Sequence, residues 1–84
     1  MFEIKLDNQP KKFLKNCEDV LFDRITAALK NLRQNPVPHD AKHIVGYALS
    51  TFRVRIGKWR ILYWINYSTN IVVVVLIEHR ERVY

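Results

Sequence analysis

The segment from Thr51 to Ile65 restricts the fold more than any other part of the chain, because apolar and polar residues alternate along it in two successive runs. Such alternation is the pattern of a strand that buries one face. Gly57 and Lys58 separate the two runs, and a two-residue loop with glycine first is typical of a tight type II′ or I′ hairpin turn. The sequence therefore predicts a β-hairpin whose two apolar faces lie on the same side.

A two-residue turn also fixes the pairing across this hairpin. The predicted pairs are Ile56 with Trp59, Arg55 with Arg60, Val54 with Ile61 and Arg53 with Leu62. Like charges directly opposite each other destabilise a strand pair by up to about 1 kcal/mol. A bound anion would explain several guanidinium groups on one face. A solvated sheet face, on which basic residues discourage edge pairing, would explain them equally well. The hairpin alone leaves both explanations open.

The size and charge of the chain narrow the class of protein. A length of 84 residues with 49% hydrophobic residues predicts a single folded domain over residues 1–84. A net charge of +6 and a pI near 9.8 favour polyanionic partners such as nucleic acid, an acidic protein or an anionic membrane. The single cysteine fits a cytoplasmic location. The start of the chain has no signal-peptide pattern. The longest apolar run, residues 71–77, is too short to span a membrane.

The first half of the chain reads as a strand followed by helical segments. Residues 2–6 alternate as a strand, and Asp7 or Asn8 followed by Pro10 marks a helix start. A short helix is expected from about Pro10, and a longer one from about Glu18 to Gln34 buries leucine and isoleucine at helical spacing. The pattern leaves open whether these are two helices or one bent helix. Prolines 36 and 38 end the helix, and residues 39–50 are expected to be a connecting segment with a turn at Gly46.

The β-branched run of residues 71–77 predicts a central strand buried on both faces, with the helices covering one face of the sheet. The fold class is thus α+β, with a mainly antiparallel, twisted sheet. The length of the turn before this strand determines which later side chains lie on the same face of the sheet as the arginines. A two-residue loop at 68–69 places His79 there, whereas a three-residue loop with Asn70 in the left-handed conformation places Arg80 there. The sequence Ser-Thr-Asn favours the second arrangement.

These motifs in this order resemble the RelE-like branch of the RelE/ParE toxin superfamily. The matching features are the strand and two helices, the Asn35-Pro36 break, the connector from Lys42 to Gly46, the hairpin FRVRIGKWRILYWI and the ending HRERVY. The likeness covers nearly the full chain. It implies a small basic toxin that enters the ribosomal A site and cuts mRNA there, using no cofactor or metal. It also implies an acidic RelB-like antitoxin that holds the toxin inactive.

The resemblance implies roles for individual residues. Arg60 corresponds to an arginine that holds the scissile phosphate. Arg80 corresponds to one that stabilises the transition state and protonates the leaving group, and Tyr84 to a tyrosine that stacks on the substrate nucleotide. Arg53 and Arg55 stand where the family often has lysines, one of them a proposed general base. This is a departure, because arginine remains protonated and is a poor base, although it can clamp a phosphate.

Cleavage would proceed by attack of a ribose 2′-OH on the adjacent phosphate, for which an arginine cluster supplies positioning and charge neutralisation. The arginines do not provide a group that transfers protons. His79 is the nearby side chain of a type that titrates near neutrality, so it is predicted to assist catalysis; the ribosome and the substrate are the alternative source of a proton path. Trp64, on the arginine side of the hairpin, is the candidate for base stacking, and Lys58 and Arg82 are further candidates for RNA contact.

Other chemically active side chains have simpler explanations. Trp59 is expected in the core, and Cys17 in helix packing, because no base is placed near the thiol. His39 and His43 have a spacing that a metal could use, but two prolines upstream and the lack of further ligands favour a solvated loop. Two rivals to the nuclease remain. One is a ParE-like inhibitor of DNA gyrase, and the other is a catalytically weak homologue that binds RNA or the ribosome.

Overall fold

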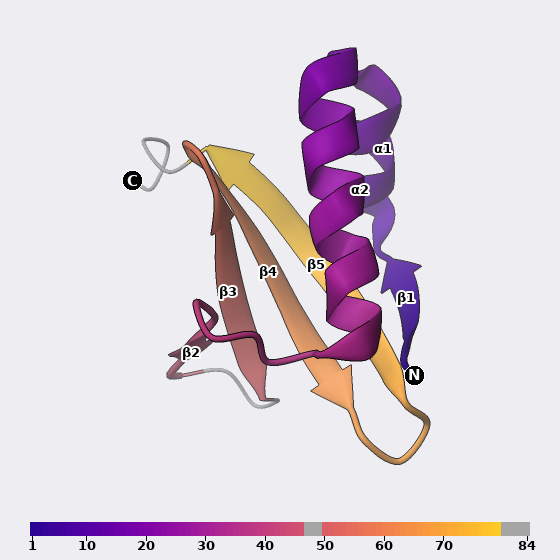
Figure 1. The fold of residues 1–84 in the computed structure, drawn as a ribbon, viewed down its shortest axis with the longest axis vertical. Coiled ribbons are helices and arrows are strands. Elements are labelled where there is room, and N and C mark those ends of the chain that lie inside the picture. The colour runs from indigo at the N-terminus through magenta and orange to yellow at the C-terminus, as the bar shows by residue number, and fades with distance from the viewer. Residues whose placement is uncertain (47–49, 80–84) are drawn as a thin grey trace.

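The computed structural model describes residues 1–46 and 50–79. The elements in chain order are β1 (Glu3–Leu6), α1 (Asn8–Asn16), α2 (Asp19–Gln34), β2 (Lys42–Ile44), β3 (Thr51–Ile56), β4 (Trp59–Asn66) and β5 (Ile71–His79). The strands form one sheet in the order β1-β5-β4-β3-β2, and both helices lie against one face of it (Figure 1). The predicted α+β architecture is confirmed.

The helical region consists of two helices. Cys17 and Glu18, between them, have extended backbone conformations (ψ 163° and 159°), which interrupt the helical hydrogen-bond pattern. The second helix buries the residues that its spacing predicted, and they pack on the sheet in one core; these are Leu21, Ile25, Leu29 and Leu32. This face of the sheet is called the helix face below.

The hairpin of β3 and β4 has the predicted register. Ile56 pairs with Trp59, so the loop contains two residues, and the pairs Arg55 with Arg60 and Arg53 with Leu62 follow. Gly57 has φ 60°, and Lys58 has a negative φ, as a type II′ turn requires. The three arginines therefore lie on the side of the sheet opposite the helix face, and this side is called the arginine face.

Two strand pairings were not predicted. Three of the four pairings are antiparallel as expected, but β1 runs parallel to β5, with Ile4 opposite Val72. In addition, part of the expected connecting segment forms β2, which pairs with β3 and sets Lys42 opposite Arg53. A strand of three residues is too short to show alternation, so the sequence gives no signal for it.

Strand β5 lies inside the sheet, between β1 and β4. Its helix-face residues Val72, Val74 and Ile77 are buried, but Val73 and Leu76 on the arginine face are only half-buried. The prediction of burial on both faces was therefore right for one face only.

A β-bulge sets the register of the second half of β5. The loop from β4 is one residue longer than predicted, because Asn66 pairs with Ile71, although Asn70 does have the expected left-handed conformation (φ 56°). A loop of this length would move every side chain of β5 to the other face. The bulge inserts Val75 between the pairs Tyr63–Val74 and Leu62–Leu76 and restores the phase.

Candidate functional site

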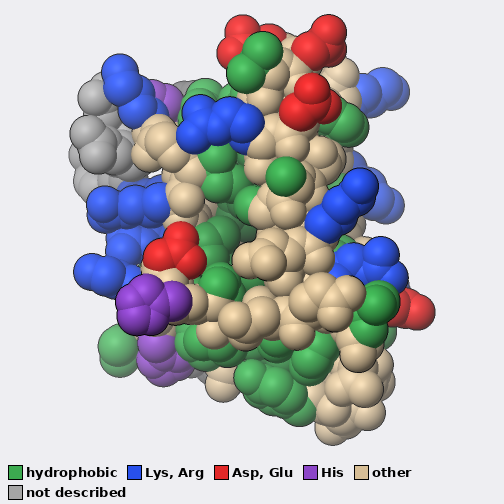
Figure 2. Space-filling view, viewed as in Figure 1, with side chains coloured by type: hydrophobic (Ala, Val, Ile, Leu, Met, Phe, Trp, Pro, Cys, Tyr) green, Lys and Arg blue, Asp and Glu red, His purple; other side chains and the backbone are tan. Residues whose placement is uncertain are grey.

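The arginine face is organised in rows that run across the strands. Nearest the hairpin turn, one row contains Arg55, Arg60 and Glu78. The next row contains Lys42, Arg53, Leu62 and Leu76, and the row after that contains Thr51, Trp64, Val73 and Lys5. Four cations are thus concentrated at the β2–β3–β4 end of the face. Figure 2 shows lysine and arginine side chains along the edge of the molecule on the β3 side.

The arginines present hydrogen-bond donors that the described part of the chain does not use. Arg53 and Arg60 are half-buried, and the Nε atom of each is buried without a hydrogen-bond acceptor among residues 1–46 and 50–79. Burial, followed by the charges of Arg55 and Arg60, lowers the pKa of Arg53. Buried N–H groups without an acceptor are costly, so an anion placed here would gain charge-assisted hydrogen bonds and relieve the repulsion between cations.

Glu78 joins this cluster and was missed by the sequence analysis. It lies directly across from Arg60, so Arg60 stands between Arg55 on one side and a carboxylate on the other. The predicted conflict between two arginines is therefore balanced in part by Glu78. The turn that the sequence favours, with Arg80 on the arginine face, also puts Glu78 on this face by strand alternation, but the sequence analysis did not consider this carboxylate.

His79 does not belong to the cluster, and its predicted catalytic role is corrected here. It pairs with Trp59 on the helix face, where the two rings meet edge to face with centroids 5.0 Å apart. Trp59 also contacts Phe13 of α1 (4.9 Å), as expected for a residue packed at the core. Strand alternation turns His79 away from Arg60, because Glu78 occupies the position on the arginine face.

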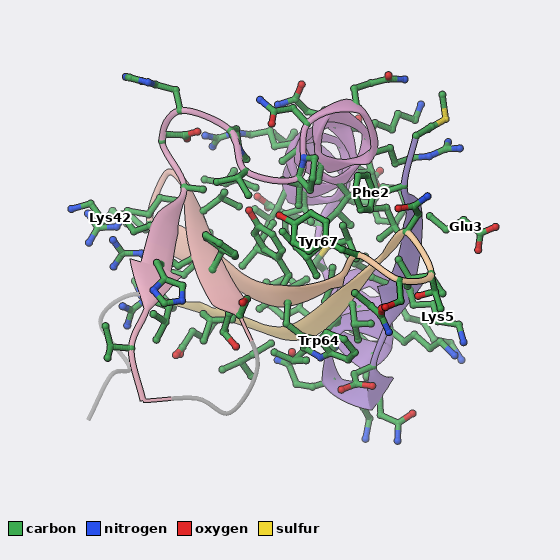
Figure 3. All side chains as sticks on the ribbon, turned by 90° about the horizontal axis from the view of Figure 1, so that it is seen from below. Phe2, Glu3, Lys5, Lys42, Trp64 and Tyr67 are labelled. Carbon is green, nitrogen blue, oxygen red and sulfur yellow. The ribbon has the colours of Figure 1, made fainter. Side chains whose placement is uncertain are left out.

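The remaining predicted site residues lie on the arginine face, at the hairpin turn or outside the described residues. Trp64 is half-buried on the arginine face, and Figure 3 shows it on the opposite side of the sheet from Phe2. Lys58 is exposed at the hairpin turn. Arg80, Arg82 and Tyr84 lie outside the described residues.

Gln9 of α1 holds the end of β5 that carries Glu78. Strand β1 ends at Leu6, opposite Val74, so beyond that point the outer edge of β5 has no neighbouring strand among residues 1–46 and 50–79. The side-chain amide of Gln9 takes this place: its Nε2 donates to the carbonyl of Ile77 (2.8 Å), and its Oε1 accepts from the Ile77 N–H (2.9 Å). These are the two hydrogen bonds that a strand would have made.

The other reactive side chains are engaged elsewhere. The thiol of Cys17 donates to the carbonyl of Leu14 (3.7 Å), and burial raises its pKa. His39 and His43 are exposed, and the His43 ring packs against Phe52 (5.3 Å). Within residues 1–46 and 50–79, no three histidine, cysteine or acidic side chains lie close enough together to hold a metal ion. No helix among these residues is both long and apolar enough to cross a membrane.

Solved structures of toxin–antitoxin complexes contain the same fold. The chain superposes on the toxin of the archaeal RelE–RelB complex from Pyrococcus horikoshii with a TM-score of 0.84, at 22% identity, covering 96% of this chain and 97% of that one. The Escherichia coli RelBE toxin–antitoxin complex gives a TM-score of 0.83, at 14% identity, over 98% of this chain and all of that one. The fold is therefore that of the RelE toxins.

The sequence places the chain within that class. Residues 4–84 match the family described as ParE toxin of type II toxin-antitoxin system, parDE, so the chain belongs to this toxin family. A curated relative from Methanocaldococcus jannaschii, with the name “Putative toxin RelE1”, is 28% identical over 86 aligned positions, covering 99% of this chain and 94% of the relative. The predicted membership of the RelE/ParE superfamily is confirmed.

Proposed function

We propose that this toxin is a ribosome-dependent mRNA endonuclease that inhibits translation. The observation that supports this most directly is the cluster of Arg53, Arg55 and Arg60 on one sheet face, with two buried guanidinium Nε atoms that have no acceptor in the described chain. A phosphodiester is an anion that these donors suit, because guanidinium groups match phosphate oxygens in geometry and charge.

The reaction proposed is an internal transesterification of the mRNA in the ribosomal A site. The ribose 2′-oxygen attacks the adjacent phosphorus, the bond from phosphorus to the 5′-oxygen breaks, and the products carry a 2′,3′-cyclic phosphate and a 5′-hydroxyl. Arg60 would hold the scissile phosphate, with Arg53 and Arg55 adding positive charge, so that the extra negative charge of the phosphorane is stabilised. This chemistry uses no metal or cofactor.

Further residues would bind the mRNA around this point. Trp64 lies two rows from Arg60 along β4 and offers an aromatic face for a neighbouring base. Lys58 would contact a phosphate from the hairpin turn. The resemblance adds Arg80 as a second transition-state arginine, Tyr84 as a stacking residue and Arg82 as an RNA contact.

The partner proposed is an acidic RelB-like antitoxin encoded with the toxin and acting in the cytoplasm. Solved relatives of this fold are complexes of RelE with RelB, from Pyrococcus horikoshii and Methanococcus jannaschii among others. The net charge of +6 favours an acidic partner of this kind.

Primer extension in a purified translation system tests the proposal. Wild type, Arg60→Ala and a control, Lys30→Ala on the exposed surface of α2, would each be incubated with mRNA, with and without ribosomes. We expect cuts at fixed codon positions only when ribosomes are present, and a fall of about 100-fold or more in the rate for Arg60→Ala. The lysine variant should cut as wild type does.

Two other results would replace the proposal. A block of translation without cleavage would identify a ribosome-binding inhibitor. Normal translation without cleavage would favour the ParE-like alternative, in which the target is DNA gyrase. Inhibition of supercoiling by purified gyrase is the assay for that alternative.

A further inference from the structure

The proposed reaction requires a group that accepts the proton of the ribose 2′-OH. The structure limits the side chains that could serve as this base. Arginine is a poor base, because a guanidinium group holds its proton tightly. His79 lies on the helix face. Among the described residues of the five strands, the arginine face carries two carboxylates, Glu78 beside Arg60 and Glu3 near the far end of the sheet opposite Ile71.

Glu78 is adjacent to the arginine that would hold the scissile phosphate. The two residues form a direct cross-strand pair, and side chains in such pairs begin about 4.5–5.5 Å apart at their Cβ atoms. In a ribonucleotide the 2′-oxygen is a near neighbour of the phosphate that it attacks. A phosphate held by Arg60 therefore brings the 2′-hydroxyl to the same part of the face as the Glu78 carboxylate.

The backbone next to Glu78 is held in place by contacts on the helix face. The preceding residue, Ile77, is buried on the helix face and is bonded through both its N–H and its carbonyl to Gln9. Glu78 itself is half-buried. A base that is held in place in this way needs little reorganisation when the substrate arrives.

We propose that Glu78 is a catalytic residue of this toxin and is the general base of mRNA cleavage. This inference rests on the proposed nuclease function. The Glu78 carboxylate takes the proton from the 2′-hydroxyl as the bond from the 2′-oxygen to phosphorus forms. The bond from phosphorus to the 5′-oxygen breaks, and its electron pair remains on the 5′-oxygen, which takes a proton from water. Glu78 then releases its proton to the solvent, and the charge and atoms balance.

The competing explanation is that Glu78 only neutralises Arg60. The two explanations predict opposite results for Glu78→Gln, which keeps the shape of the side chain and removes its charge. A lost base slows cleavage, whereas a lost counter-ion frees Arg60 for the phosphate and strengthens both binding and cleavage.

Single-turnover cleavage of mRNA on programmed ribosomes distinguishes them. The proteins are wild type, Glu78→Gln, Glu78→Ala, Arg60→Ala and the control Glu3→Gln. Loss of a general base typically costs 10²–10⁴-fold, so we expect Glu78→Gln to cut about 100-fold or more slowly, with Glu3→Gln unchanged. Sodium formate should restore part of the rate to Glu78→Ala, and sodium chloride at the same ionic strength should not.

A binding measurement completes the test. Affinity for ribosomes carrying mRNA with a 2′-deoxy nucleotide at the cleaved position should be equal or higher for Glu78→Gln. If Glu78→Gln cuts at the wild-type rate or faster while Arg60→Ala is inactive, the base assignment is overturned and the nuclease function stands. If Glu78→Gln fails to bind, its slow cleavage reports lost binding and the assignment is also overturned. If wild type does not cut at all, both proposals are refuted.

Discussion

The hydrogen bonds between the Gln9 side chain and the backbone of Ile77 should contribute measurably to the stability of the fold. Gln9→Leu keeps most of the volume of the side chain and removes both bonds, which measure 2.8 and 2.9 Å. Each bond of this kind contributes about 0.5–1.5 kcal/mol net, so the free energy of unfolding should fall by roughly 2 kcal/mol. In a domain of this size that corresponds to a fall in Tm of roughly 10 °C.

Urea denaturation and amide hydrogen exchange measure the effect. The Ile77 amide should exchange faster in Gln9→Leu, because it loses its acceptor. Gln34→Leu, at the exposed end of α2, is the matched control and should stay within about 0.5 kcal/mol of wild type, as is usual for surface substitutions. A Gln9→Leu variant as stable as this control would refute the strand-replacing role of Gln9.

The variant Gln9→Glu adds a pH dependence of known sign. The introduced carboxylate accepts from the Ile77 N–H but faces the Ile77 carbonyl without a proton, whereas the protonated form restores both bonds. Folding therefore favours the protonated form and raises the pKa of the introduced group in the native state. The deficit in stability relative to wild type should be full at neutral pH and should shrink as the pH falls towards about 4, the ordinary range of a glutamate.

Three further predictions concern other parts of the fold. Tyr63→Phe should lower the free energy of unfolding by about 1 kcal/mol in urea denaturation, because the buried hydroxyl donates to the carbonyl of Pro36 at 2.7 Å. Gly57→Ala should cost about 1–2 kcal/mol in the same assay, because φ is 60° there, whereas the added Cβ would make only an ordinary contact with the Arg24 guanidinium at 3.4 Å. Gly57→Asn should cost less, since asparagine tolerates positive φ. Cys17 should react with iodoacetamide more slowly than a free thiol between pH 7 and 8, because its raised pKa leaves less thiolate; an equal rate would contradict the described burial.

The parts of the structure that local rules determine could be predicted from the sequence. The β3–β4 register followed from alternation and a two-residue turn, and it placed Arg53, Arg55 and Arg60 on one face without any tertiary information. The helical region also followed from apolar spacing, but its division into two helices did not. In each case the signal lies within a few residues of the feature that it determines.

The rest depends on contacts that are distant in the sequence. The run from Ile71 to Ile77 contains no polar residue to mark a face, so the longer loop before it and the bulge at Val75 that compensates for this loop could not be read from the sequence. The pairing of β1 with β5 and the bonds from Gln9 to Ile77 join opposite ends of the chain.

The parallel pairing of β1 with β5 means that the sheet cannot be completed until β5 has been synthesised. Strand β1 is synthesised well before β5, with which it pairs, so a nascent chain that ends before Ile71 contains β1 without its partner. It also lacks Glu78, while Arg60 is already present on an incomplete sheet. A chain truncated before Ile71 therefore lacks a strand from the interior of the sheet and, under the function proposed above, also lacks its general base.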